Sequence, residues 1–174
     1  IFAGSRTCLG TIRPRLTRQA EERTMADRYS GEDVVAIART WLGTPYRHQA
    51  SCRGAGADCL GLVRGVWRNV VGPEPEALPA YSPDWAEATG EERILEAAQR
   101  CLNRVPEAEA TTGDVLLFRM LSRGPAKHMA ILTTNSLQPG GLIHAYSGHA
   151  VCETSLTPSW RRRMAGVFRF PTVV

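Results

Sequence analysis

The chain has 174 residues, a length that fits a single domain. Hydrophobic residues make up 43% and charged residues 22%, which is ordinary for a globular protein that buries a core without disulfide or metal staples. The net charge of +4 favours an anionic partner but is too small to indicate nucleic-acid binding. The sequence has no apolar run approaching the roughly 18 residues that span a bilayer.

The N-terminal 24 residues differ from the rest of the chain. They are rich in arginine and lack the apolar centre of a secretory signal. The first methionine, Met25, stands just before the first clear helix signal. We therefore expect a native start at Met25, with residues 1–24 forming a loose arm or a non-native extension and residues 25–174 forming one domain. We also expect synthesis in the cytoplasm without a signal peptide.

The first half of the remaining chain has helical periodicity. The stretch "SGEDVVAIARTWLG" predicts a helix that Ser30 caps, with Asp33 three residues later and Gly43 at its end. Residues 59–71 predict a second helix with an apolar face. A third helix is predicted to open at Thr89 and to end before Pro106.

The second half consists of short apolar or alternating runs that are typical of strands. They lie at residues 114–120, 128–134, 142–147, 151–156 and 166–170, with turn-forming residues between them. Helices followed by strands indicate an α+β fold, in which N-terminal helices pack on a C-terminal antiparallel sheet.

Cys59, in "GADCLGLVRGVW", stands at the predicted start of the second helix. Asp58 is suited to cap this helix, and Gly54 and Gly56 permit a tight approach before it. The positive end of a helix and its free N–H groups favour the thiolate, which is the attacking form of cysteine, and can hold an oxyanion. From this stretch alone, a cysteine that is simply buried is an equally good interpretation.

Three of the four histidines lie in the strand half and are candidates for the base that a cysteine nucleophile needs. Facing residues of an antiparallel hairpin have a constant index sum. His128 and His144 face each other if this sum is 272, with the turn centred on Ser136. A turn at Pro139 gives a sum of about 279 and brings His149 nearer to His128. The residues alone leave His144 and His149 open as the group that orients the base.

The cysteine spacing argues against a structural metal site. No CxxC pair is present, and no cysteine has a histidine at zinc-finger spacing, so we predict neither a metal nor a cofactor. An odd number of cysteines does not indicate a disulfide framework, although a bridge from Cys52 to Cys59 would silence the latter. The cysteines are at positions 8, 52, 59, 101 and 152.

Four motifs, in this order, carry a resemblance to a known family. "ADCLGLV", "TGDVLLF", "KHMAIL" and "LIHAYS" resemble the NlpC family of papain-like cell-wall cysteine endopeptidases, over about residues 31 to 170. The resemblance implies that Cys59 is the nucleophile, that His128 is the base and that His144 orients it. It also implies that Tyr46 and Asp58 lie near the oxyanion and the substrate.

The same resemblance implies a function and a setting. The expected reaction is hydrolysis of an amide bond in peptidoglycan stem peptides, between D-glutamate and a diamino acid. The chain, including the terminal "GVFRFP", is similar to the branch found in phage tails and gene transfer agents. We therefore expect a tail component that binds tip or hub proteins and acts in the periplasm or cell wall of the target cell, with neither nucleic acid nor a membrane span involved.

Two departures from the family pattern concern substrate recognition. Many members have serine directly after the cysteine, where this chain has Leu60, and the loop from Tyr46 to Cys59 is long. Two alternatives on this fold are a catalytically idle structural tail component and an acyltransferase, which would need an apolar acyl channel. A basic module that binds nucleic acid or an anionic polymer is a further alternative, and "WRRR" at 160–163 could bind phosphate or an anionic wall polymer.

Overall fold

The computed structural model describes residues 29–75, 90–121 and 123–173. The predicted arm over residues 1–24 and the start at Met25 lie outside these ranges. The third predicted helix begins at Arg93 and not at Thr89, because residues 90–92 are not helical. Within these ranges there are three helices of two to three turns: α2 (Gly31–Arg39), α3 (Cys59–Val70) and α5 (Arg93–Cys101). The capping box predicted for the first helix is confirmed, because the Asp33 N–H donates to Ser30 Oγ and the Ser30 N–H donates to Asp33 Oδ2.

Six strands form one antiparallel sheet in the order β3-β8-β4-β5-β6-β7. A two-stranded hairpin, β1 (Ser51–Cys52) and β2 (Gly56–Ala57), stands apart in the loop before α3. The predicted α+β class is confirmed. The strands of the sheet are β3 (Asn103–Val105), β4 (Val115–Arg119), β5 (Ala126–Leu132), β6 (Gly141–His144), β7 (Cys152–Ser155) and β8 (Met164–Arg169).

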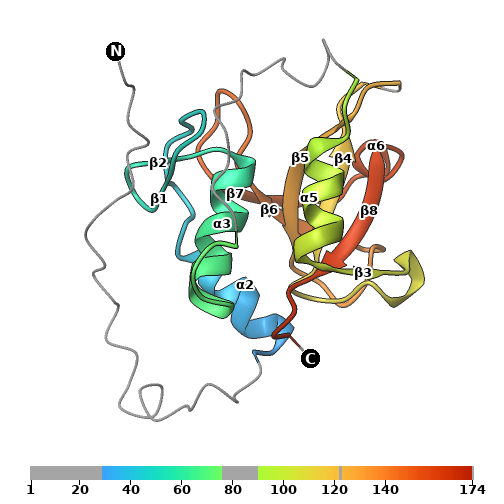
Figure 1. Ribbon diagram of the computed structural model, residues 1–174, viewed down its shortest axis with the longest axis horizontal. Helices are drawn as coiled ribbons and strands as arrows, with labels where there is room; N and C mark the ends of the chain where they lie inside the picture. Colours follow the sequence, from blue (N-terminus) through green and yellow to red (C-terminus); the bar gives the residue numbers. More distant parts are fainter. Residues whose placement is uncertain (1–28, 76–89, 122, 174) are drawn as a thin grey trace.

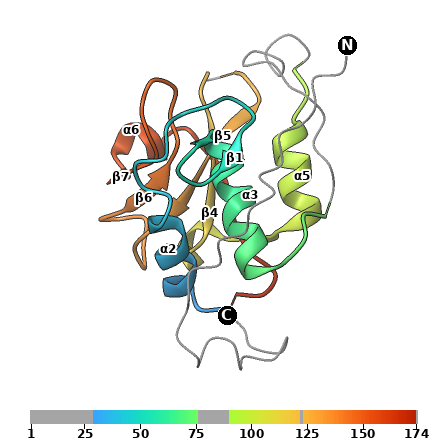
Figure 2. The same cartoon turned by 90° about the vertical axis from the view of Figure 1, so that its left-hand side faces the viewer.

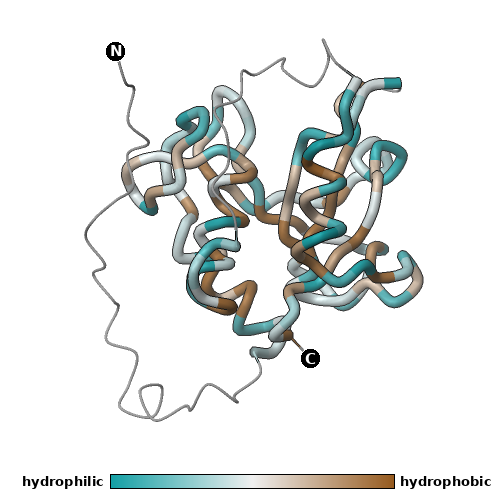
Figure 3. Tube along the Cα trace, in the orientation of Figure 1, coloured by the Kyte–Doolittle hydropathy of each residue, from teal (hydrophilic) through white to brown (hydrophobic). Residues whose placement is uncertain are grey.

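The helices lie on one face of the sheet, with α3 and α5 against its middle strands (Figures 1 and 2). The helix-side core lies between these helices and the sheet. The opposite face of the sheet is covered by loops and a one-turn helix, α6 (Pro158–Arg161), which enclose the loop-side core. The helix-side core includes Val34, Trp41, Leu62, Val66, Met129, Ile131, Ile143 and Phe168. The loop-side core includes Leu116, Phe118, Ala130, Leu132, Leu137, Leu142 and Val167. Apolar segments accordingly gather on α3 and the central strands, and polar ones on the outer turns (Figure 3).

The hairpin of β5 and β6 has a register close to the predicted one. Ile131 faces Ile143 and Leu132 faces Leu142, which is an index sum of 274 rather than 272. A shift of two in the sum keeps every side chain on its face, so His128 and His144 remain on the same side of the sheet. The turn at Pro139, with its sum of about 279, is not formed.

The sequence interpretation missed three strands, namely β1, β2 and β3. Each has two or three residues, and each is stabilised by pairing with a partner rather than by a long apolar run. Over the ranges that the structure describes, no helix has the length and apolar character needed to cross a membrane.

Candidate active site

Cys59 is the first residue of α3, and Asp58 is its N-cap. The Asp58 carboxylate accepts hydrogen bonds from the Gly61 N–H and from the Gln49 N–H, each at 2.7 Å. It therefore joins the start of the helix to the preceding loop, and His48 Nδ1 lies 3.7 Å from its Oδ2. Asp58 is buried and has a structural role in this site; contact of Asp58 with a substrate stays a prediction.

The strand next to Cys59 has an open edge. Among the described residues, β5 pairs with β6 only at Ile131 and Leu132, so the two strands diverge beyond that point. Main-chain groups of alternate residues in a strand point to the same edge. Lys127 and Met129 therefore direct their N–H and C=O groups into the gap that β6 leaves.

The Cys59 side chain fills this gap. Its thiol donates a weak hydrogen bond to the Lys127 carbonyl at 3.8 Å, and the Met129 N–H is directed at the sulfur. The sulfur thus contacts the main chain on both sides of His128. Cys59 is a free thiol, so it is not bridged to Cys52.

His128 and His144 form a hydrogen-bonded pair. His128 Nε2 lies 2.9 Å from His144 Nδ1, and both residues are 5% exposed. His144 Nε2 in turn lies 3.4 Å from the Thr154 hydroxyl on β7. Since Nε2 of His128 is occupied, Nδ1 is the ring nitrogen left for another partner. Nδ1 is bonded to Cγ, which carries the Cβ of His128, and the Cys59 sulfur contacts the main chain at the residues on either side of His128.

Tyr46 lies on the loop side of the cysteine. It forms an isolated parallel bridge with Ala57, two residues before Cys59. Burial raises the pKa of its phenol, and the charges of Asp58 and Cys59 raise it further, which places the ring within electrostatic reach of both residues. The structure therefore brings Tyr46, Cys59, His128 and His144 to one end of the β5–β6 gap.

Burial dominates the electrostatics of the site. It raises the pKa of the Cys59 thiol to about 12, and the Asp58 charge adds to this, whereas N–H groups of Met129, Leu60 and Cys59 lower it. Burial also lowers the pKa of His128 to about 3, aided by His144. The N–H groups at the helix start favour the thiolate as predicted, but in the free protein the loss of hydration outweighs them.

The remaining candidates lie around this centre. His149 is exposed and close enough to His144 to assist burial in lowering its pKa to about 4, but the partner of His128 is His144. Asp114, which we interpret as a turn cap, accepts from the Thr111 N–H and also binds the Arg169 guanidinium through both oxygens.

Two aromatic residues that the sequence interpretation did not place at the site border the histidine pair. The Trp160 ring stacks on His128 with centroids 5.2 Å apart, and the half-exposed Tyr146 meets His128 edge-on at 5.8 Å. "TPSW" signals a short helix, because Thr157 caps it and Pro158 opens it, but nothing local to these residues indicates where the indole packs.

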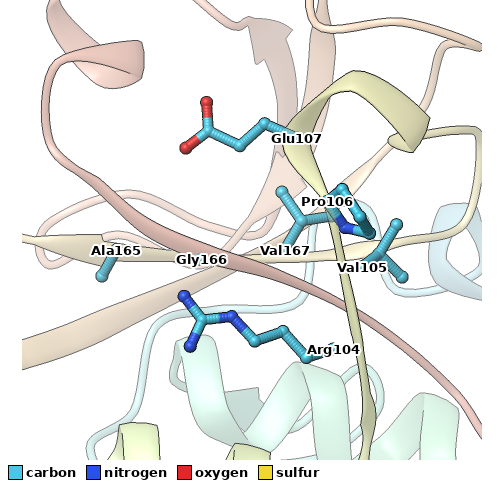
Figure 4. A pocket seen from close by; sticks show the side chains of 7 residues that line it. All are labelled: Arg104, Val105, Pro106, Glu107, Ala165, Gly166 and Val167. Carbon is cyan, nitrogen blue, oxygen red and sulfur yellow. The ribbon is translucent and has the colours of Figure 1, made fainter.

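We find no second candidate site in the pocket over β3 and β8 or among the metal-binding residue types of the described chain. One pocket lies over β3 and β8, but Arg104 and Glu107 point to opposite sides of the β8 ribbon at Gly166, so their charges do not converge (Figure 4). Within the described ranges there is no group of three or more histidine, cysteine or acidic side chains arranged to hold a metal ion.

A helix-start thiol set against a sheet that carries paired histidines defines a papain-like α+β domain. The chain belongs to the NlpC/P60 family, whose model matches residues 43–169. No curated protein matches it.

Solved structures share the fold at low identity. An NlpC/P60 family protein from Bacillus cereus is similar at 21% identity and a TM-score of 0.58, over 82% of this chain and 41% of that protein. This chain thus spans less than half of that protein's length. The NlpC/p60 domain of the peptidoglycan hydrolase SagA is similar at 22% identity and a TM-score of 0.56, over 82% of this chain and all of that domain. NlpC1 from Trichomonas vaginalis is similar at 20% identity and a TM-score of 0.54, over 80% of this chain and 44% of that protein.

Proposed function

We propose that this protein is a cysteine peptidase that hydrolyses an amide bond in peptidoglycan stem peptides. The observation that carries the proposal is the placement of the Cys59 sulfur against the main chain around His128, whose ring is bonded to His144. Membership of the NlpC/P60 family and the shared fold with the SagA domain support a cell-wall substrate.

In the proposed mechanism the proton moves as the sulfur attacks. Cys59 passes its proton to His128 Nδ1 while Sγ bonds to the amide carbon, which gives a tetrahedral intermediate. His128 then donates the proton to the leaving amine, and the C–N bond breaks to leave a thioester. Water attacks the thioester with His128 as base, which releases the acid and restores the thiol.

His144 sets the tautomer that this sequence requires. His128 accepts a proton on Nδ1 only if Nε2 carries the hydrogen, which it donates to His144 Nδ1. His144 must then carry its own hydrogen on Nε2, where the Thr154 hydroxyl lies 3.4 Å away. The hydrogen bonds thus point in one direction, from His128 through His144 to Thr154.

The oxyanion has two donor groups within reach in this proposal. The Cys59 N–H is at the free N-terminal end of α3, where no carbonyl of the helix accepts it. The Tyr46 hydroxyl, from the preceding loop, is the second donor. Such donors stabilise charge that develops in the intermediate, and losing one costs about 100-fold or more in turnover.

Digestion of purified peptidoglycan tests the proposal. We expect mass spectrometry to find new fragments split between D-glutamate and the diamino acid. Cys59→Ala should remove this activity, and Cys59→Ser should be nearly inactive because a serine hydroxyl is a far weaker nucleophile. Cys101→Ala and Cys152→Ala are matched controls and should keep most of it.

The possible results separate the alternatives. Full activity in Cys59→Ala would exclude a nucleophilic role for this residue. No fragments from the wild-type protein would favour an idle tail component, and cleavage at another bond would overturn the proposed specificity alone.

We further propose that a phage-like tail delivers the enzyme. The support is the similarity of the motifs and of "GVFRFP" to the tail and gene-transfer-agent branch. Purified tail-like particles should contain the protein bound to tip or hub proteins. Recovery only as a free protein, from cells that assemble such particles, would contradict this role.

A further inference from the structure

We propose that Trp160 is a positioning residue, whose indole covers the His128–His144 hydrogen bond and holds the His128 ring toward Cys59. The inference rests on the proposed function, because it assigns His128 as the base. It concerns a residue of "WRRR" that otherwise contributes only to a solvated basic segment.

The geometry places one indole against both imidazoles. The Trp160 ring lies nearly parallel to His128, at 25° with centroids 5.2 Å apart. It meets His144 edge-on, at 83° with centroids 5.4 Å apart. The two imidazoles themselves meet at 78° with centroids 5.2 Å apart, so the indole closes one side of the angle between them. Water is thereby kept from that side of the hydrogen bond.

The indole is itself held in place by its contacts with the loop-side core. It packs edge-on against Phe118, with centroids 5.1 Å apart, and Phe118 is fully buried in the loop-side core. The main-chain N–H of Trp160 donates to the Thr157 hydroxyl at 3.4 Å, and Thr157 thereby caps the one-turn helix that carries the indole. Tyr146 meets the indole edge-on at 6.2 Å from the outer side. The partly buried Trp160 is thus packed against the loop-side core of the sheet.

Strand pairing holds the main chain of His128 on one side only, where His128 faces Phe118 of β4. The pairing of β5 and β6 stops at Ile131 and Leu132, before it reaches His128. The imidazole of His128 is therefore held by one hydrogen bond and by packing. A ring that tilts away from Cys59 loses the proton-transfer geometry, and an ångström of misplacement can lower turnover by about 100-fold.

The indole also acts on the charge of the base. It keeps His128 dry and so favours the neutral form, which accepts the proton. The titratable side chains around His128 are His144 on β6, Tyr146 after it and Cys59 on α3, with His149 behind His144.

Four variants test the role: Trp160→Ala, Trp160→Leu, Trp160→Phe and, as a control that removes a remote indole, Trp67→Leu. Trp67 packs on Phe170 in the helix-side core, away from the histidines. We expect Trp160→Ala and Trp160→Leu to lower kcat at least about tenfold with little change in KM. Trp160→Phe, which keeps a stacking ring, should stay within about threefold of the wild type. Trp67→Leu should keep its kcat even if its Tm falls.

A second readout does not depend on substrate. NMR titration of the His128 ring, assigned by comparison with His128→Gln, should show its pKa rising from about 3 toward its ordinary 6.5 in Trp160→Ala. The pKa should stay low in Trp160→Phe and in Trp67→Leu. If Trp160→Ala does not fold, the comparison of Trp160→Leu with Trp160→Phe decides.

The outcomes separate this inference from the proposed function. An unchanged His128 pKa in the folded Trp160→Ala or Trp160→Leu protein, or wild-type kcat in either, would overturn the role of Trp160. Failure of the wild-type protein to cleave peptidoglycan would instead reject the proposed function, while a rise in the His128 pKa would still show that the indole shields the ring.

Discussion

The resting charge state of Cys59 gives the sharpest test of the site's electrostatics. Burial raises the pKa of its thiol to about 12 and lowers that of His128 to about 3. At neutral pH the free protein should therefore hold a neutral thiol beside a neutral imidazole, and not a thiolate–imidazolium pair. We expect Cys59 to react slowly with iodoacetamide at pH 7.

The size of the effect follows from the pKa. A rise from the ordinary 9.0 to about 12 lowers the thiolate fraction at pH 7 about thousandfold. The more basic thiolate is intrinsically more nucleophilic, by a factor of about 20 to 30 over this range. The net rate should thus be about 30- to 50-fold below that of an exposed thiol, before any loss of access is counted.

The assay follows carboxamidomethylation of the peptide that contains Cys59 by mass spectrometry, between pH 5 and pH 9. Because the thiolate fraction grows tenfold per pH unit below the pKa, the rate should climb steeply across the whole range. His128→Gln should change it little, since a neutral imidazole does not stabilise the thiolate. A rate that is flat from pH 5 to 8 and collapses in His128→Gln would reveal an ion pair and refute this reasoning.

Three further predictions concern the histidines and the sheet. His144→Ala should lower turnover at least about 100-fold with an unchanged circular dichroism spectrum, and His149→Ala should not; the reverse order would make His149 the orienting residue. Because the pKa of His128 is lower in the folded protein, this histidine takes up a proton in the unfolded chain as the pH falls below 6.5 but stays neutral in the folded protein. Urea unfolding should therefore show a loss of about 2 kcal/mol in the free energy of unfolding between pH 7 and pH 5. This loss should shrink in His128→Gln, and an identical loss there would contradict the assignment. Asp114→Asn, which weakens the buried carboxylate's bonds to Arg169, should lower the free energy of unfolding by about 2 kcal/mol, and an unchanged urea midpoint would contradict it.

The sequence was sufficient for those features that depend on local interactions. The capping residue Ser30 bonds to Asp33 within the same turn, and Asp58 caps the helix that begins at Cys59. The order of helices and strands follows from the periodicity of apolar side chains, which reflects burial on one face. These patterns were enough to predict the α+β class and the start of the second helix at Cys59.

The strand register was predicted only to within two residues. Both index sums, 272 and 274, keep His128 and His144 on one face, so the apolar pattern cannot distinguish them. Leu137 of the connecting loop is buried in the loop-side core, and the loop 133–140 thereby becomes part of the packing. β3 was missed because its short, polar Asn103–Val105 segment is a strand only by pairing with β8.

The charge state of the site and the place of Trp160 were decided by tertiary structure alone. A helix start by itself predicts a lowered thiol pKa for Cys59, but the divergence of β5 and β6 lets the sulfur enter a gap where burial raises it. Trp160 is separated from His128 by 32 positions in the sequence, yet its ring stacks on it. Hydration and ring contacts depend on which atoms surround a group, and those atoms come from chain segments whose arrangement no local pattern encodes.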